Sequence, residues 1–389
     1  METSSYERVC LCALNTIFGY RPAIAHALIS HLGSGAAVFA LEPAVRRELL
    51  RGHPVYAERI DGRALDTAAR HLEHAGARGV TFVSIADDCY PELLRECPDH
   101  PVGLYVCSSS PSSSLFGKRP FISIVGTRDM SSYGREWCGR IVEALAATKE
   151  KPAIVSGLAY GTDITAHMKA LDSGLPTFAV MATGTDSIYP RTHRSAAGRI
   201  ARSEGSALIT DFPPCTAPAA VNFIRRNRII AGLSSALILT ESRLKGGGMI
   251  TAGLACGYSR PVFALPGRLD DERSLGCIRL IGNKSAETFS SPGELARRLG
   301  LHILSRSSPS PEERIRSQYS AIPPEKLSII INIYGIIASS GGLNQDEICR
   351  STGLPWPEVS ECTAMLESDG FISIDLMQRC TAAGSFFSE

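Results

Sequence analysis

The sequence predicts an α/β protein with a doubly wound parallel sheet at its centre. Between residues 119 and 304, short apolar runs alternate with segments of helical periodicity. The runs are almost continuously apolar, which is typical of strands covered by helices on both faces of a parallel sheet. Several runs end in a glycine-containing loop, at the edge where such sheets bind their ligands. The expected strands are residues 121–126, 153–157, 177–182, 207–210, 236–241 and 261–267.

Two further parts are expected before this core, because 389 residues exceed one ordinary domain. Residues 1–75 contain short helical stretches separated by glycines and are rich in arginine. Such helix–glycine–helix pairs can present backbone N–H groups to a phosphate, but the same pattern builds any small helical bundle. Residues 76–118 are expected to be a linking segment with a strand, a turn, a short helix and a serine-rich loop.

Two parts are also expected after the core. Residues 305–320 are a linker that is rich in serine, proline and charge. Residues 321–383 are expected to form three helices and then a β-hairpin, which is the order of a winged-helix domain. This last part has three basic and eight acidic residues, a net charge of −5. That charge disfavours contact with a phosphate backbone and favours contact with another protein.

The composition excludes several classes of protein. With 44% hydrophobic and 20% charged residues, the chain resembles soluble globular proteins. No apolar run has the length of a membrane span, and the N-terminus lacks the pattern of a secretory signal, so a cytoplasmic protein is expected. The twelve cysteines include no CxxC pair, which favours scattered reduced thiols over disulfides or a metal site. Because the net charge is only +1, any nucleic-acid binding must come from a local basic cluster.

Such a cluster opens the stretch FIRRNRIIAGLS, residues 223–234. Phe223 is followed by Arg225, Arg226 and Arg228, and then by an apolar run. In a helix, Phe223 and Arg226 share one face. A ring that stacks on a base and an arginine that meets the neighbouring phosphate can together hold single-stranded nucleic acid. The other interpretation is a solvated basic helix start with Phe223 in the core.

Loops at the carboxyl ends of the expected strands supply further candidate ligand contacts. Their glycines let the backbone turn sharply or come close to a phosphate, and the helix starts that follow expose N–H groups. Asp163 and His167 in the second loop stand four residues apart, which favours a structural hydrogen bond over catalysis. The loop residues of interest are Gly126, Thr127, Arg128, Gly157, Gly161, Lys245, Gly246 and Gly247.

Three enzyme motifs are absent from the sequence. The first loop reads GTRDMSSYG instead of the GxGxxG of nicotinamide dehydrogenases, and the second strand ends in Ser156 where those enzymes have an acidic residue. No P-loop pattern GxxxxGK[ST] occurs. The residues around Ser156 do not form a GxSxG elbow, and no His and Asp complete a triad. We therefore expect neither a catalytic site nor a bound cofactor.

Ordered motifs run through most of the chain, and they are YPELL (90–94), IVGTR (124–128), SGLAYGTDITAH (156–167), IYP (188–190), FIRRNRIIAGLS (223–234), ITAGLA (250–255), ALPG (264–267) and SLGC (274–277). Together they resemble the DNA-processing protein A family, whose members are also called Smf proteins. The resemblance implies a Rossmann-like core that binds single-stranded DNA, forms a homodimer and loads the RecA recombinase during natural transformation, without being an enzyme. It also implies a sterile-alpha-motif-like helical domain for residues 1–75 and a winged helix for residues 321–383.

The resemblance assigns DNA-binding roles to individual residues. Arg128 matches an arginine of the family's VGSR-type loop. The residues that match its FPxRNR segment are Phe223, Arg226, Asn227 and Arg228. The chain departs from the family where Gly246–Gly248 replace Ser-Gly-Ser, and where no lysine precedes Phe223. The predicted single-strand-binding residues are Gly126, Thr127, Arg128, Gly157, Gly161, Phe223, Arg225, Arg226, Asn227, Lys245, Gly246 and Gly247, with no catalytic residue and no metal ligand.

Two alternatives to this function stay open at the level of sequence. Nucleoside-monophosphate phosphoribohydrolases have a related Rossmann-like fold and use a PGGxGTxxE motif. The comparable loop here, KGGGMITAGLA, has no glutamate after it, so a hydrolase of that type lacks its expected acidic group. The second alternative is a scaffold that binds no DNA and recruits partners through its acidic C-terminal part.

Overall fold

The computed structural model describes residues 4–117, 119–304, 311–340, 342–375 and 377–382. The chain divides into two compact units, Met1–Leu304 and Ser305–Glu389. Among the described helices, none combines the length and the apolar character that a membrane span needs.

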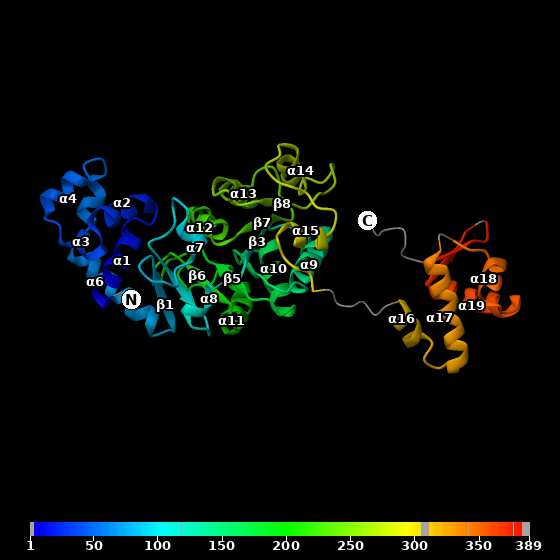
Figure 1. The fold of residues 1–389 in the computed structure, drawn as a ribbon. Helices are drawn as coiled ribbons and strands as arrows, with labels where there is room; N and C mark the ends of the chain where they lie inside the picture. The colour runs from blue at the N-terminus through cyan, green and yellow to red at the C-terminus, as the bar shows by residue number, and fades with distance from the viewer. Residues whose placement is uncertain (1–3, 118, 305–310, 341, 376, 383–389) are drawn as a thin grey trace. The chain divides into compact units, whose positions relative to one another are not determined.

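One eight-stranded sheet organises the first unit, with the strand order β1-β2-β6-β5-β4-β3-β7-β8 (Figure 1). Neighbouring strands from β6 to β8 in this order are parallel, whereas β1 pairs antiparallel with β2, and β2 antiparallel with β6. The strands are β1 (Val80–Ser84), β2 (Gly103–Cys107), β3 (Phe121–Val125), β4 (Ala153–Ser156), β5 (Thr177–Val180), β6 (Ala207–Thr210), β7 (Ala236–Leu239) and β8 (Val262–Ala264).

The α/β class and the six strands expected in the core, β3 to β8, are confirmed. Strand β2 was not expected. Residues 76–118 add two antiparallel strands, β1 and β2, to the edge of the sheet, and so they do more than link two domains. The apolar run of β2 is short and lies between Pro101 and the serine-rich loop, a context that favours a turn.

The sheet is doubly wound. Helices α12 (Ala220–Leu233) and α13 (Gly247–Gly257) cover one face, and α9 (Ser132–Ala146) and α10 (Thr162–Asp172) cover the other (Figure 1). The chain runs outward from β3 to β6 and then crosses back to β7 on the other side of β3. The strand order therefore reverses between β3 and β7, and sheets of this class bind ligands beyond the carboxyl strand ends at such a point.

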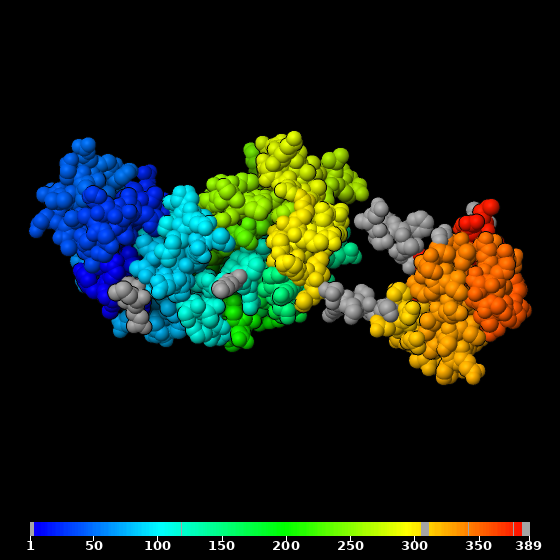
Figure 2. Space-filling view, viewed as in Figure 1, coloured from blue at the N-terminus to red at the C-terminus, as the bar shows by residue number. Residues whose placement is uncertain are grey.

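The N-terminal helices belong to the same compact unit. They are α1 (Ser5–Ile17), α2 (Pro22–Leu32), α3 (Gly35–Ala40), α4 (Pro43–Leu49), α5 (Pro54–Arg59) and α6 (Gly62–Gly76). Ser4 and Asp61 start α1 and α6 as N-caps, because their side chains accept N–H groups of the first helical turn. Buried residues of α1 and α6 share a core cluster with Phe82 of β1 and Tyr105 of β2. In Figure 2 the blue surface of the N-terminal helices lies directly against the cyan surface of the segment that follows.

Further short elements complete the first unit. They are α7 (Glu92–Arg95), α8 (Ser112–Leu115), the 3-10 turn η1 (Arg191–His193), α11 (Arg194–Arg202), α14 (Leu275–Gly282) and α15 (Pro292–Arg298).

The second unit has its own apolar core. Its elements are α16 (Pro311–Gln318), α17 (Pro324–Ser339), α18 (Gln345–Thr352), α19 (Trp356–Ser368) and the antiparallel strands β9 (Ile372–Ile374) and β10 (Cys380–Ala382). Asn344 and Glu347 form a capping box at the start of α18. The expected order of three helices and a hairpin is present in α17 to β10, and its assignment as a winged helix stays a prediction. Residues 305–310 of the predicted linker and residue 383 lie outside the described residues.

Candidate nucleic-acid interface

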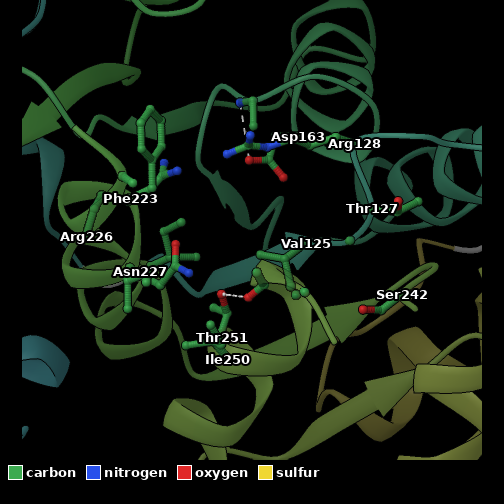
Figure 3. Close-up of a pocket in the computed structure, with 18 of the residues that line it drawn as sticks. Val125, Thr127, Arg128, Asp163, Phe223, Arg226, Asn227, Ser242, Ile250 and Thr251 are labelled. Carbon is green, nitrogen blue, oxygen red and sulfur yellow. Dashed lines mark hydrogen bonds between the residues drawn. The ribbon is translucent and has the colours of Figure 1, made fainter. Parts of the chain in front are cut away.

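A pocket of about 740 Å³ opens beyond the carboxyl ends of β3, β4 and β7, where the strand order reverses. Figure 3 shows Phe223, Arg226 and Asn227 on one side of it, and Thr127 and Ser242 on the other. Residues from five separate stretches of sequence therefore meet in one hollow. Of the residues predicted to bind DNA, those that line it are Gly126, Thr127, Arg128, Phe223, Arg226, Asn227, Lys245, Gly246 and Gly247.

An aromatic and cationic cluster forms one wall of the pocket. The Phe223 ring, near the start of α12, is half-buried. The Arg128 guanidinium lies over this ring, 5.4 Å from its centroid, and the Tyr189 ring meets it edge to face at 5.4 Å. Tyr189 is 45% exposed. Two aromatic rings and a cation at a pocket edge are suited to contact with a planar group.

Tyr189 is a candidate functional residue that sequence reasoning missed. It belongs to the motif IYP, but the motif alone does not say where the ring points. Tyr189 lies in the loop after β5, and only the folded chain brings that loop to the start of α12.

Arg226 lies in the floor of the pocket. Its side chain is buried, and the guanidinium donates a hydrogen bond to the carbonyl of Val180 at the end of β5. Burial lowers the pKa of Arg226 to about 10, so the side chain is still charged at neutral pH. Burial also raises the pKa of the Asp163 carboxyl, and the nearby charge of Arg226 opposes this rise. Arg226 therefore stabilises the floor of the pocket through its hydrogen bond to β5. The sequence had suggested a phosphate contact for this residue instead.

Arg225 lies outside the pocket, unlike its neighbour Arg226, and its role as a DNA contact stays a prediction. Its guanidinium lies 4.5 Å from the ring centroid of Tyr20 and 4.4 Å from that of Phe212. It also forms a 2.7 Å ion pair with the buried Asp211. Arg228 forms a second 2.7 Å ion pair with the same carboxylate. The side chain turns toward the N-terminal helices because a buried carboxylate and two rings lie there.

Gly157 and Gly161 support the pocket without lining it. Gly161 precedes α10 with φ +71°, and an added Cβ would collide with the carbonyl oxygen of Thr127. A Cβ on Gly157 would collide with the guanidinium of Arg226. Both glycines therefore act indirectly, since they let the loop at Thr127 and the side chain of Arg226 come close to β4.

We expect Gly161→Ala to destabilise the first unit by roughly 1–2 kcal/mol, because alanine is strained at positive φ and its Cβ meets the carbonyl of Thr127. Urea unfolding measures this change. Gly253→Ala is the matched control, since Gly253 lies within α13 with open space around it and alanine favours helices. Equal stability of Gly161→Ala and the wild type would contradict the proposed strain.

The rim opposite the aromatic wall favours anions. Lys245 and Gly246 are exposed, and Gly246 is the N-cap of α13. The first N–H groups of a helix lack partners within the helix and carry a partial positive charge. Arg243 also lines the pocket, but its guanidinium forms ion pairs with Asp129 and Glu272, each at 3.5 Å. Lys245 and the start of α13 thus place positive charge on this side of the pocket.

The chain is similar in sequence to known proteins. The sequence profile of the family described as DNA recombination-mediator protein A matches residues 81–300. The protein Smf of Synechocystis sp. is 37% identical over 249 residues, which are 64% of this chain and 61% of that protein. The chain thus spans less than two thirds of the length of this relative.

Two solved structures have similar folds. The X-ray structure of DNA processing protein A from Streptococcus pneumoniae has a TM-score of 0.62 and 29% identity, and the match covers 76% of this chain and 98% of that one. DNA processing protein A from Helicobacter pylori, described for its single-stranded DNA binding mode, has a TM-score of 0.50 and 26% identity, over 56% of this chain and 95% of that one. With the family profile covering more than half of the sequence, the chain belongs to the DNA recombination-mediator protein A family.

Proposed function

We propose that the pocket at the β3–β7 reversal binds single-stranded DNA. The observation that carries the proposal is the cluster of Phe223, Tyr189 and Arg128 opposite Lys245 and the start of α13. Unpaired bases stack on such rings, while cations and helix N-termini hold the phosphates between them. The similarity to the Helicobacter pylori protein supports the same ligand class.

The binding mode implies little sequence preference. Every base has a face that can stack on an aromatic ring, and phosphate contacts carry no base identity. Bases in a duplex are already stacked and paired, so the aromatic wall favours single strands. These are the properties needed by a protein that covers DNA of any sequence.

The pocket offers poor support for a phosphoribohydrolase. Asp163 is the carboxylate among the lining residues, and its oxygen accepts the N–H groups of Gly157 and Ala159 next to the charge of Arg226. The nearby Glu241 is buried and accepts both the N–H and the hydroxyl of Ser131. Both carboxylates are thus committed to holding loops, and neither is presented to a ligand as a general acid or base.

We propose further that the chain acts as a homodimer in the cytoplasm and passes single-stranded DNA to a RecA-type recombinase during recombination or natural transformation. The family's description as a recombination mediator supports this role. The acidic composition of residues 321–383 favours a protein contact for the second unit, because like charge repels a phosphate backbone.

Fluorescence anisotropy with labelled oligo-dT and a duplex of equal length, each at two salt concentrations, tests DNA binding. The proposal predicts tighter binding of the single strand, and weaker binding at the higher salt concentration. Absence of binding, or equal affinity for the duplex, would count against the pocket and favour the scaffold alternative.

We expect Lys245→Ala to lower the salt dependence of oligo-dT binding. Each phosphate contact to a single strand contributes about 0.7 to the slope of log K against log salt, so loss of one contact makes the slope shallower by about 0.7. Lys149→Ala is the control, because Lys149 is exposed but does not line the pocket. An unchanged slope in Lys245→Ala would remove this lysine from the site.

A further inference from the structure

Three residues with metal-binding side chains meet at a point away from the pocket. His74 lies in the last turn of α6, Asp186 follows β5, and Cys215 follows β6. One donor atom from each lies within 4.8 Å of the others. Asp186 Oδ2 is 3.5 Å from His74 Nε2 and 3.3 Å from Cys215 Sγ. The cluster therefore connects the N-terminal helices to two strand-end loops of the sheet.

The two distances from Asp186 Oδ2 fit the edges of a zinc tetrahedron. Zinc bonds are about 2.0–2.1 Å to nitrogen or oxygen and about 2.3 Å to sulfur, which places neighbouring donors roughly 3.3–3.6 Å apart. Both distances from Asp186 Oδ2 lie in this range. Imidazole, carboxylate and thiolate are also the ligand types that zinc uses in proteins.

His74 Nε2 supplies a further observation. This atom is buried, and its 3.5 Å approach to Asp186 Oδ2, an ion pair only when the imidazole is protonated, does not form a hydrogen bond. Nε2 therefore faces the Asp186 carboxylate and the Cys215 thiol without a hydrogen bond to either. A buried polar atom left in this way costs free energy, and a metal ion would satisfy it.

The loops also hold Asp186 in place for coordination. The Cys215 N–H donates to both carboxylate oxygens of Asp186 at 3.0 Å. Cys215 has φ +62°, a conformation uncommon for a residue with a side chain, and it keeps Sγ on the carboxylate side. An added Cβ on Gly184 would lie 2.7 Å from Asp186 Oδ1, so glycine there leaves room for the carboxylate.

We propose that His74, Asp186 and Cys215 form a site for a zinc-class divalent cation, with a fourth position for water. The ion clamps α6 to the loops after β5 and β6. This inference rests on no assumption about DNA binding. The sequence alone predicted no metal site, because the three ligands come from segments far apart in the chain and no CxxC spacing marks them.

Arg78 is the competing charge at this site. Its Nη1 lies 3.2 Å from His74 Nδ1, and the same nitrogen lies 3.4 Å from the carbonyl oxygen of His74. Coordination through Nε2 needs the proton on Nδ1, so the exposed Arg78 must turn away from that nitrogen. Arg78→Ala is therefore expected to tighten metal binding several-fold, which a purely structural His74–Asp186 pair does not predict.

Cobalt(II) is the probe for the test, added to the untagged full chain. We expect one equivalent to bind with a thiolate-to-cobalt charge-transfer band, and zinc to abolish the band by displacement. Cys215→Ala should lose the band and bind at least tenfold more weakly. Cys256→Ala is the matched control, because Cys256 is another exposed cysteine outside the cluster.

A second readout keeps the proposal falsifiable if a variant is perturbed. Zinc should raise the melting temperature of the wild type and of Cys256→Ala, and leave that of Cys215→Ala unchanged. Absence of a cobalt band in the wild type, a band that survives in Cys215→Ala, or an equal zinc effect on all three proteins would overturn the site.

Discussion

Replacing Phe223 by alanine is expected to weaken oligo-dT binding by about 1–3 kcal/mol, or roughly 5- to 160-fold, because a base loses its stacking platform. Arg128 and Tyr189 also lose the ring against which they lie. Phe223→Tyr keeps a ring of similar size and should retain most of the affinity. Anisotropy titration at one fixed salt concentration measures the three proteins side by side.

The control for this substitution is Tyr6→Ala. Tyr6 is an aromatic residue on α1 that is 57% exposed and does not line the pocket, so its loss should leave affinity unchanged. Wild-type affinity in Phe223→Ala, or an equal loss in Tyr6→Ala, would show that the bases do not stack at α12.

Replacing Asp211 by alanine is expected to destabilise the first unit by about 3–5 kcal/mol. Asp211 is fully buried and pairs with both Arg225 and Arg228 at 2.7 Å. Its removal leaves two arginines without their carboxylate, and an unpaired buried charge costs far more than a surface ion pair contributes. The backbone carbonyl of Asp211 also accepts a 2.9 Å hydrogen bond from Asn15 Nδ2, which connects helix α1 to this ion-pair cluster.

Urea unfolding followed by tryptophan fluorescence measures this loss. The chain has two tryptophans, Trp137 in α9 and Trp356 in the second unit, so a Trp356→Phe background reports on the first unit alone. Asp172→Ala is the control, because the Asp172–Arg199 pair is exposed and such pairs contribute about 0–1 kcal/mol. Similar destabilisation by both substitutions would contradict the role assigned to Asp211.

The sequence was sufficient to predict the parts of the fold that follow from local pattern. Strands β3 to β8 are short, apolar and separated by helices, so periodicity alone located them. The helical face shared by Phe223 and Arg226 follows from positions three residues apart, and both residues line the pocket.

The sequence pattern could not predict the direction of a side chain whose partners lie far away in the sequence. Arg225 and Arg226 are neighbours in sequence, yet one turns to the buried Asp211 and the other to the carbonyl of Val180. The direction in which each arginine turns depends on where buried acceptors lie in the folded chain. Tyr189 was missed for the same reason, since its place beside Phe223 depends on the path of the loop after β5.

The most direct test of the central claim is ultraviolet crosslinking of oligo-dT to the full chain, with the crosslinked peptides identified by mass spectrometry. Aromatic rings in contact with thymine bases give such crosslinks, so the proposed pocket predicts peptides that contain Phe223 or Tyr189, the two rings of its wall. Their yield should fall in Phe223→Ala. Crosslinks found only within residues 1–75 or 321–383 would contradict the claim and move the DNA to another part of the chain.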